Sequence, residues 1–182
     1  MSLALVQPPP DRDAAFARLV PVVTRWCHRL GAGRIDAEAA ASDVLVVVLR
    51  RWDEIRHDRP VEAWAWGVTL RVVQRHRRQG WWRRWVQGGE VSTSPAPRAD
   101  GPDAHDTARA VLAILDRLKE EHREVLVLMD MEERPAPEVA GLLGVPEGTV
   151  RSRLRAARMA FREVAESMGM NRISVLKDAT DA

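Results

Sequence analysis

Arginines recur at helical spacing along one stretch of this sequence, and no acid interrupts them. Between residues 148 and 162 there are five: Arg151, Arg153, Arg155, Arg158 and Arg162. Side chains three or four residues apart share one face of a helix, so most of this set forms a cationic stripe. One interpretation is the solvated face of an amphipathic helix, but such faces normally mix charges of both signs. Arginines alone favour contact with the phosphates and bases of nucleic acid.

Two helices joined by a tight turn, over residues 135–165, are predicted to carry this stripe. Pro137 suits the first turn of a helix, and Gly144 suits the left-handed conformation that ends one. Pro146 then begins a longer helix whose apolar residues share one face. Those residues are Val150, Leu154, Ala157, Phe161, Val164 and Met168. This pattern is typical of a helix-turn-helix, whose second helix enters the DNA major groove.

The second helix of such a motif reads bases from its N-terminal residues, while phosphate contacts fix its position. The residues expected to meet bases are Arg151, Ser152 and Arg155. The residues expected to bind phosphates are Arg153, Arg158 and Arg162.

Charge and composition divide the 182 residues into two dissimilar halves. The net charge is +2, but residues 1–90 carry 15 Lys and Arg against 10 Asp and Glu, whereas residues 91–182 carry 13 against 16. All seven tryptophans precede residue 90. Such asymmetry predicts two domains with different tasks.

Several classes of protein are disfavoured by the residues that are missing. Cys27 is the only cysteine, so no intramolecular disulfide is possible and a buried, inert thiol is expected. The five histidines are scattered, which argues against a metal site, and neither a catalytic motif nor a cofactor motif is present. The N-terminus lacks the features of a signal peptide, and no apolar run reaches the about 20 residues of a membrane helix. We expect a soluble, cytoplasmic protein without cofactors.

An all-α fold is predicted, with two small helical domains joined by a flexible linker. The expected helices are 11–30, 36–52, 61–79, 107–119 and 120–131, followed by the helix-turn-helix. Pro21 should kink or break the first helix. The apolar run 44–49 could form a strand, but the alanines before it favour a buried helix. The expected domains are 11–86 and 107–168, with a linker at 87–106 that is rich in Gly, Ser, Pro and Asp.

Two blocks of sequence resemble a known family, the extracytoplasmic-function (ECF) sigma factors of bacterial RNA polymerase. The stronger block, residues 115–163, resembles region four through the runs Arg123-Glu124-Val125-Leu126 and Gly148-Thr149-Val150-Arg151-Ser152-Arg153-Leu154. The weaker block, residues 14–79, resembles region two through Asp36-Ala37-Glu38, Ala63-Trp64 and Arg77-Arg78.

The resemblance implies core RNA polymerase and promoter DNA as partners, together with an anti-sigma factor. It assigns recognition of the −35 element to the arginine-rich helix. It assigns recognition and melting of the −10 element to Trp64, Trp66, Arg71, Arg75, Arg77 and Arg78. It assigns polymerase binding to Asp36, Glu38, Asp43, Arg50 and Arg51. In this role the tryptophans would stack on unpaired bases, and the arginines would bind the phosphates of the separated strand.

The side chains assigned to melting also have structural interpretations. Trp64 shares a face with Val68 and Val72, which favours a place in the core, whereas Trp66 lies off that face and is expected to be free. The cations of residues 71–78 have no acid among them, so we expect them not to be neutralised. The roles of Trp81, Trp82 and Trp85 stay open between docking of the linker, DNA and a protein partner.

This chain departs from the family pattern at several places, two of which concern the residues assigned to polymerase and the −10 element. Ala39 to Ser42 stand where polar residues usually help to bind the polymerase clamp, and Arg71 and Arg75 replace an Asn and an Asp. The alternative function is a helix-turn-helix regulator that binds an operator but does not bind polymerase as a sigma factor. Binding to core polymerase distinguishes the two.

Overall fold

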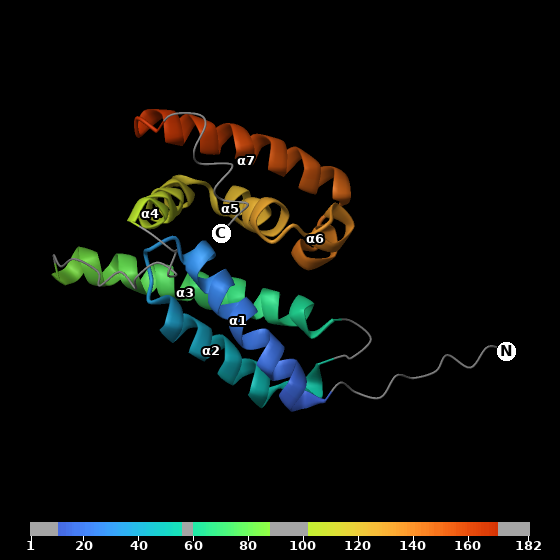
Figure 1. Cartoon of the computed structure of the whole chain (residues 1–182). Helices are drawn as coiled ribbons and strands as arrows, with labels where there is room; N and C mark the ends of the chain where they lie inside the picture. The colour runs from blue at the N-terminus through green and yellow to red at the C-terminus, as the bar shows by residue number, and fades with distance from the viewer. Residues whose placement is uncertain (1–10, 56–59, 88–101, 171–182) are drawn as a thin grey trace.

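The computed structural model describes residues 11–55, 60–87 and 102–170, and all regular structure in these ranges is helical (Figure 1). The N-terminal half contains α1 (Arg12–Gly31), α2 (Ala37–Arg50), the 3-10 turn η1 (Trp52–Glu54) and α3 (Val61–Gln87). The C-terminal half contains α4 (Pro102–Arg117), α5 (Glu120–Leu126), the π-helical turn η2 (Val127–Met131), α6 (Ala136–Leu143) and α7 (Glu147–Ser167). The predicted all-α fold is confirmed.

Helices α1, α2 and α3 pack against one another as a bundle. Asp36 begins α2 as its N-cap, because its side chain accepts a hydrogen bond from the backbone N–H of Ala39 at 3.0 Å. The run 44–49 is helical, as predicted, and Val44 and Val48 are fully buried. Pro21 lies inside a continuous α1, so of the predicted kink or break the break does not occur.

Two tryptophans meet at the centre of this bundle. Trp26 of α1 and Trp66 of α3 are both buried, with ring centroids 4.8 Å apart in an edge-to-face arrangement. The prediction that Trp66 is free was therefore wrong. The reason is that α3 packs against both α1 and α2, so its buried arc extends beyond the Val68 and Val72 face. Trp64 is only partly buried.

The helices next to the predicted linker are longer than expected. Helix α3 continues to Gln87, and α4 begins at Pro102 rather than at Thr107. Residues 102–106, which were assigned to the linker, are therefore helical. The side chains of residues 80–87, which include the cluster of three tryptophans, lie outside the described part of the structure, as do residues 88–101 of the predicted linker.

The C-terminal half forms the expected helix-turn-helix. Gly144 ends α6 with a φ of 66°, the left-handed conformation predicted for it, and Pro146 is the N-cap residue of α7. Val150, Leu154, Ala157 and Phe161 are buried along one face of α7, which packs against α5 and α6. The predicted apolar stripe of α7 is thus confirmed at these positions.

The two halves also pack against each other. Helix α6 contacts α3, while α4 and η2 contact α1, so the C-terminal helices lie on the N-terminal bundle (Figure 1). Helix α7 lies on the far side of the C-terminal half from α2 (Figure 1).

We predict that Trp66→Ala lowers the free energy of unfolding by about 3–5 kcal/mol, because it leaves a cavity beside Trp26. Trp64→Ala serves as the matched control and should cost clearly less, since Trp64 keeps contact with water. Urea unfolding followed by far-UV circular dichroism measures both. Equal losses would contradict the central position of Trp66.

Candidate nucleic-acid interface

The residues predicted to read bases lie on the exposed surface of the first turns of α7. Arg151 donates to the Glu147 carboxylate at 2.9 Å, an exposed pair that contributes little stability and that DNA can readily replace. The Ser152 hydroxyl donates to the carbonyl of Thr149 at 3.0 Å. Arg155 is exposed and has no acidic partner among the described residues. This end of α7 can therefore offer free guanidinium groups to a DNA groove.

The arginines predicted to bind phosphates are more constrained. Arg158 donates to both carboxylate oxygens of Asp130 at 2.8 and 2.5 Å, and this hydrogen bonding raises its pKa. Arg153 lies 3.5 Å from the carboxylate of Glu121 on α5, and Arg162 donates to the carbonyl of Arg158 at 3.2 Å. The stripe contains no acid in its own sequence, but α5 and η2 supply two.

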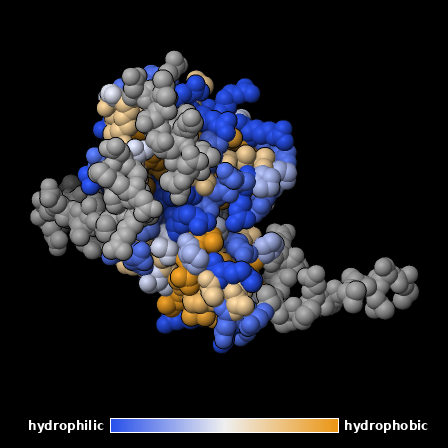
Figure 2. Space-filling view, in the orientation of Figure 1, coloured by the Kyte–Doolittle hydropathy of each residue, from blue (hydrophilic) through white to orange (hydrophobic). Residues whose placement is uncertain are grey.

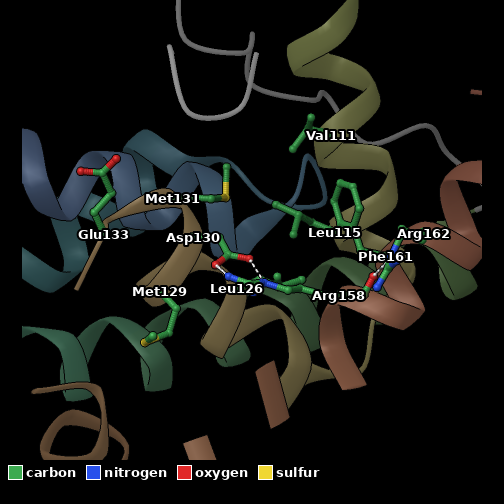
Figure 3. Close-up of a pocket in the computed structure, with 10 residues that line it drawn as sticks. All are labelled: Val111, Leu115, Leu126, Met129, Asp130, Met131, Glu133, Arg158, Phe161 and Arg162. Atoms are coloured by element: carbon green, nitrogen blue, oxygen red, sulfur yellow. Dashed lines mark hydrogen bonds and ion pairs between the residues drawn. The ribbon is translucent and has the colours of Figure 1, made fainter. Parts of the chain in front are cut away.

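A pocket of about 540 Å³ lies behind this stripe, between α4, α5, η2 and α7 (Figure 3). Val111, Leu115, Leu126 and Phe161 form its apolar walls, and the pair between Asp130 and Arg158 lies among them (Figure 3). Glu133 and Arg162 also line the pocket, so apolar walls meet charged groups of both signs there.

Some of the cations at residues 71–78 of α3 are paired with acids of other helices, and others have no acidic partner among the described residues. Arg75 donates to Asp43 on α2 at 2.7 Å, and His76 Nε2 lies 2.9 Å from the same oxygen. Arg77 donates to the carbonyl of Gly31 at 2.8 Å and to Asp116 of α4 at 2.9 Å. The prediction that these cations are not neutralised was wrong for Arg75 and Arg77, because acids from other helices reach them.

The two remaining cations of this group, Arg71 and Arg78, are exposed and have no acidic partner in the described part of the chain. The hydrogen bond from His76 is the main cause that lowers the pKa of Asp43, and Arg75 adds to it against the opposing effect of burial. Asp43 therefore stays charged and joins α2 to α3.

The residues predicted to bind polymerase lie along α2 and just beyond it. Arg50 and Arg51 are exposed, and Glu38 is exposed with an oxygen 3.3 Å from His28 Nε2. Asp36 is occupied as the helix cap, and Asp43 by its pairs with α3. Two apolar side chains of this helix, Val46 and Leu49, are 44% and 45% exposed. This helix thus presents apolar and cationic groups together, as expected of a protein-docking surface.

Three acids shape the site although nothing in the sequence marks them: Asp116, Asp130 and Glu132. Asp130 holds Arg158, while Asp116 and Glu132 bind arginines of the N-terminal half. No motif singles them out, and their partners are 28 to 107 residues away. Only the folded arrangement reveals these pairs.

The chain is a two-part helical protein that exposes arginines on a helix-turn-helix and on a second cationic helix. These features are typical of DNA-binding proteins. Comparison with known proteins narrows this class. Residues 15–83 match the family description Sigma-70 region 2, and residues 108–161 match Sigma-70, region 4.

Relatives of similar length support the same family. The RNA polymerase sigma-E factor of Streptomyces avermitilis is 33% identical over 151 residues, which cover 81% of this chain and 80% of the relative. The ECF RNA polymerase sigma factor SigL of Mycobacterium tuberculosis is 32% identical over 166 residues, which cover 87% of this chain and 91% of the relative.

Two solved structures share the fold at 21% identity. CnrH, solved in complex with the cytosolic domain of CnrY, has a TM-score of 0.62 over 86% of this chain and 90% of its own. The sigma factor RpoE, solved in complex with the anti-sigma factor NepR from Bartonella quintana, has a TM-score of 0.66 over 85% of this chain and 96% of its own.

The chain belongs to the ECF family of RNA polymerase sigma factors. It is a transcription initiation factor that directs RNA polymerase, and the operator-binding alternative is not favoured. Within the described ranges, no helix combines the length and the apolar character that crossing a membrane requires.

Two neighbouring residues of the family motif have distinct structural roles. Arg123 is buried and donates to the carbonyls of Leu115 and Leu118 at 2.7 and 2.9 Å, which closes the turn between α4 and α5. Burial lowers its pKa to about 10. Burial, reinforced by the charge of Glu120, raises the pKa of Glu124 to about 7.

We predict that Glu124→Gln stabilises the protein at pH 8 but not near pH 4. Folding raises the pKa of the Glu124 carboxyl from its ordinary value of 4.5 to about 7. This residue therefore destabilises the folded protein increasingly as the pH rises through that range. At pH 8 the substitution should raise the free energy of unfolding by about 1–2 kcal/mol, a figure that is reduced because part of the Glu124 side chain stays in water. Chemical unfolding across this pH range measures it, with the exposed Glu163→Gln as control. A gain independent of pH would contradict the raised pKa.

Proposed function

We propose that this sigma factor reads the −35 element with α7, contacts the −10 element with α3, and docks on core polymerase with α2. The main support is that exposed arginines without an acidic partner among the described residues remain on two helices from different halves of the chain: Arg155 on α7, and Arg71 and Arg78 on α3. Cations left unpaired by the protein's own acids are available to phosphates and base edges.

The proposed reading of duplex DNA uses the N-terminal half of α7. Arg155 is the principal base-reading residue. Arg151 also contacts a base once its hydrogen bond to Glu147 is replaced by one to DNA. Ser152 supplies a small hydroxyl that can meet either a base or a phosphate. The DNA phosphates are proposed to be bound by Arg153, Arg158 and Arg162. Arg158 either breaks its ion pair with Asp130 first or binds a phosphate while that pair is intact.

The proposed melting function uses the exposed surface of α3. Arg71 and Arg78 bind the phosphates of the separated strand, and the accessible part of Trp64 offers a surface on which a base can stack. Arg75 and Arg77 contribute only where DNA displaces their acids. Trp66 supports this surface from the core and does not itself meet a base.

The proposed polymerase contact centres on α2. Val46 and Leu49 provide apolar area, and Arg50 and Arg51 provide charge at the end of the same helix. Apolar area thus takes over part of the role that polar residues at 39–42 have in the family pattern. Glu38 lies at the opposite end of the helix and extends the contact.

The proposed partners include an anti-sigma factor, because the two structural neighbours were solved with such partners: CnrY and NepR. The proposed site of action is the cytoplasm, where core polymerase and promoter DNA are found.

Run-off transcription with purified core polymerase tests the function as a whole. The chain and core enzyme together should produce a transcript from a promoter upstream of the chain's own gene, and neither should do so alone. A chain that binds this DNA but neither co-purifies with core enzyme nor supports transcription would be a regulator instead.

Groove reading is tested with the holoenzyme and promoter DNA. Arg155→Ala should cost about 1–3 kcal/mol on the cognate −35 sequence and relax base preference there, because a bidentate contact with a base edge is lost. Arg162→Ala is the matched control and should weaken binding to cognate and scrambled sequences alike. Fluorescence anisotropy measures both. Equal losses on the two DNAs for Arg155→Ala would refute base reading by this residue.

A further inference from the structure

The ion pair between Asp130 of η2 and Arg158 of α7 is held by two hydrogen bonds. Both carboxylate oxygens of Asp130 accept from one edge of the guanidinium group, from Nε at 2.8 Å and from Nη2 at 2.5 Å. Arg151, by contrast, donates a single bond to Glu147 at 2.9 Å. Two parallel bonds fix the plane of a guanidinium group, whereas one bond leaves it free to turn.

The two partners of this pair are unequally exposed. The side chain of Asp130 is 23% exposed and that of Arg158 is 53% exposed, so the acid is the more shielded partner and the guanidinium reaches toward water. Leu126 and Phe161 are apolar residues of the same pocket (Figure 3). Apolar neighbours exclude water and thereby strengthen the attraction between opposite charges. We therefore expect the pair to stay closed when another anion approaches Arg158.

Asp130 uses only one edge of the Arg158 guanidinium. Arginine has five N–H donors, and the two bonds to Asp130 leave three of them. The remaining donors, on Nη1 and Nη2, have no hydrogen-bond partner within the described ranges. This second edge has the planar, two-donor geometry that binds a phosphate through two oxygens.

The backbone of η2 carries Asp130 to this contact. Within this π-helical turn, the N–H of Glu132 donates to the carbonyl of Val127, five residues earlier, at 2.9 Å. A turn of this width changes the face on which side chains lie, compared with a continuing α-helix, and such turns are frequent at functional sites. Asp130 lies inside the turn, and from there its carboxylate reaches Arg158 (Figure 3).

Arg158 is the middle one of three arginines on one face of α7. Arg155 precedes it by three residues and Arg162 follows it by four, so each lies about one helical turn away. Arg162 donates to the backbone carbonyl of Arg158 at 3.2 Å. Neither Arg155 nor Arg162 has an acidic partner in the part of the chain that the structure describes. Among these three arginines, an acid therefore fixes the orientation of Arg158.

We propose that Asp130 is a positioning residue for DNA binding: it holds one edge of the Arg158 guanidinium so that the other edge binds a DNA phosphate while the ion pair stays intact. A phosphate that displaced Asp130 would leave a shielded carboxylate without its partner and beside a second anion, which is unfavourable. This inference rests on the proposed function of α7 and deepens it by giving a role to an acid outside the helix-turn-helix.

A positioning acid and a masking acid predict changes of opposite sign. If Asp130 only neutralised Arg158, removing its charge would strengthen DNA binding, because one more cation would be available to the phosphates. If Asp130 positions Arg158, removing its charge weakens DNA binding although the chain becomes more positive. The direction of the change in affinity therefore distinguishes the two roles.

Asp130→Asn is tested in the holoenzyme by fluorescence anisotropy, on the promoter duplex used for transcription and on a scrambled duplex. It should weaken binding to both by about fivefold, a size typical of residues coupled by direct contact. Both duplexes should respond alike, because a phosphate contact carries no sequence information. The slope of log affinity against log salt should become shallower by about 0.9, the loss of one phosphate contact.

Glu133→Gln is the matched control for this substitution. It removes the same charge from an exposed acid that lines the same pocket, and it should not weaken binding. Unchanged or tighter binding by Asp130→Asn overturns the proposal, and so does an equal loss of affinity in the control.

A double-mutant cycle shows whether Asp130 acts through Arg158. In an Arg158→Ala background, Asp130→Asn should no longer weaken DNA binding, and a further loss there overturns positioning through Arg158. If circular dichroism shows that Asp130→Asn is misfolded, Arg158→Lys decides instead. Lysine keeps the charge but lacks the two-edged fork, so this variant should lose a similar affinity, whereas an unchanged affinity overturns the proposal.

Nuclear magnetic resonance of the full chain tests the fixed orientation without DNA. The Nε–H of Arg158 should exchange slowly with water in the wild type and faster in Asp130→Asn, and rapid exchange in the wild type overturns the proposal. If the wild-type holoenzyme binds neither duplex, the proposed function of α7 fails and this inference fails with it. If the wild type binds both duplexes and Asp130→Asn binds them equally well, only this inference fails.

Discussion

Several arginine side chains of this molecule are held by acids or carbonyls of other helices and turns, and these contacts join the helices to one another. Arg123 closes the turn between α4 and α5 through backbone carbonyls. Arg158 joins α7 to η2 through Asp130, and Arg25 and Arg29 join α1 to the segment after η2. A guanidinium group stripped of water needs such partners, because its charge cannot be removed by deprotonation at ordinary pH.

The same requirement separates structural arginines from those available to DNA. A chain that binds nucleic acid needs cations without partners, yet a folded chain tends to neutralise any cation that lies near an acid. In this protein Arg155, Arg71 and Arg78 stay unpaired within the described residues, on two helices of different halves. The other cations discussed on α7 and at residues 71–78 of α3 are paired with acids or carbonyls. DNA can bind them only by replacing or sharing these partners.

The centre of region two is formed by packed tryptophans. Trp26 and Trp66 form the centre of the bundle, and the alanines of α2 let that helix pack closely beside them. Helix α3 buries aromatic area on one side and exposes arginines on the other. The exposed apolar residues of α2, Val46 and Leu49, lie outside this core and remain available to a protein partner.

The sequence by itself determined what depends on neighbours in the chain: helical periodicity, the caps at Asp36 and Gly144, the turn before α7 and the family motif. It also predicted Arg151, Ser152 and Arg155 as the residues that meet bases, and the structure leaves all three exposed. It did not predict that Trp66 is buried, because the width of the buried arc on α3 depends on how many helices pack around it. The sequence could not predict the partners of Arg75, Arg77 and Arg158 either. Charge pairing depends on distance in space, and only the tertiary structure brings Asp43, Asp116 and Asp130 to arginines 28 to 39 residues away.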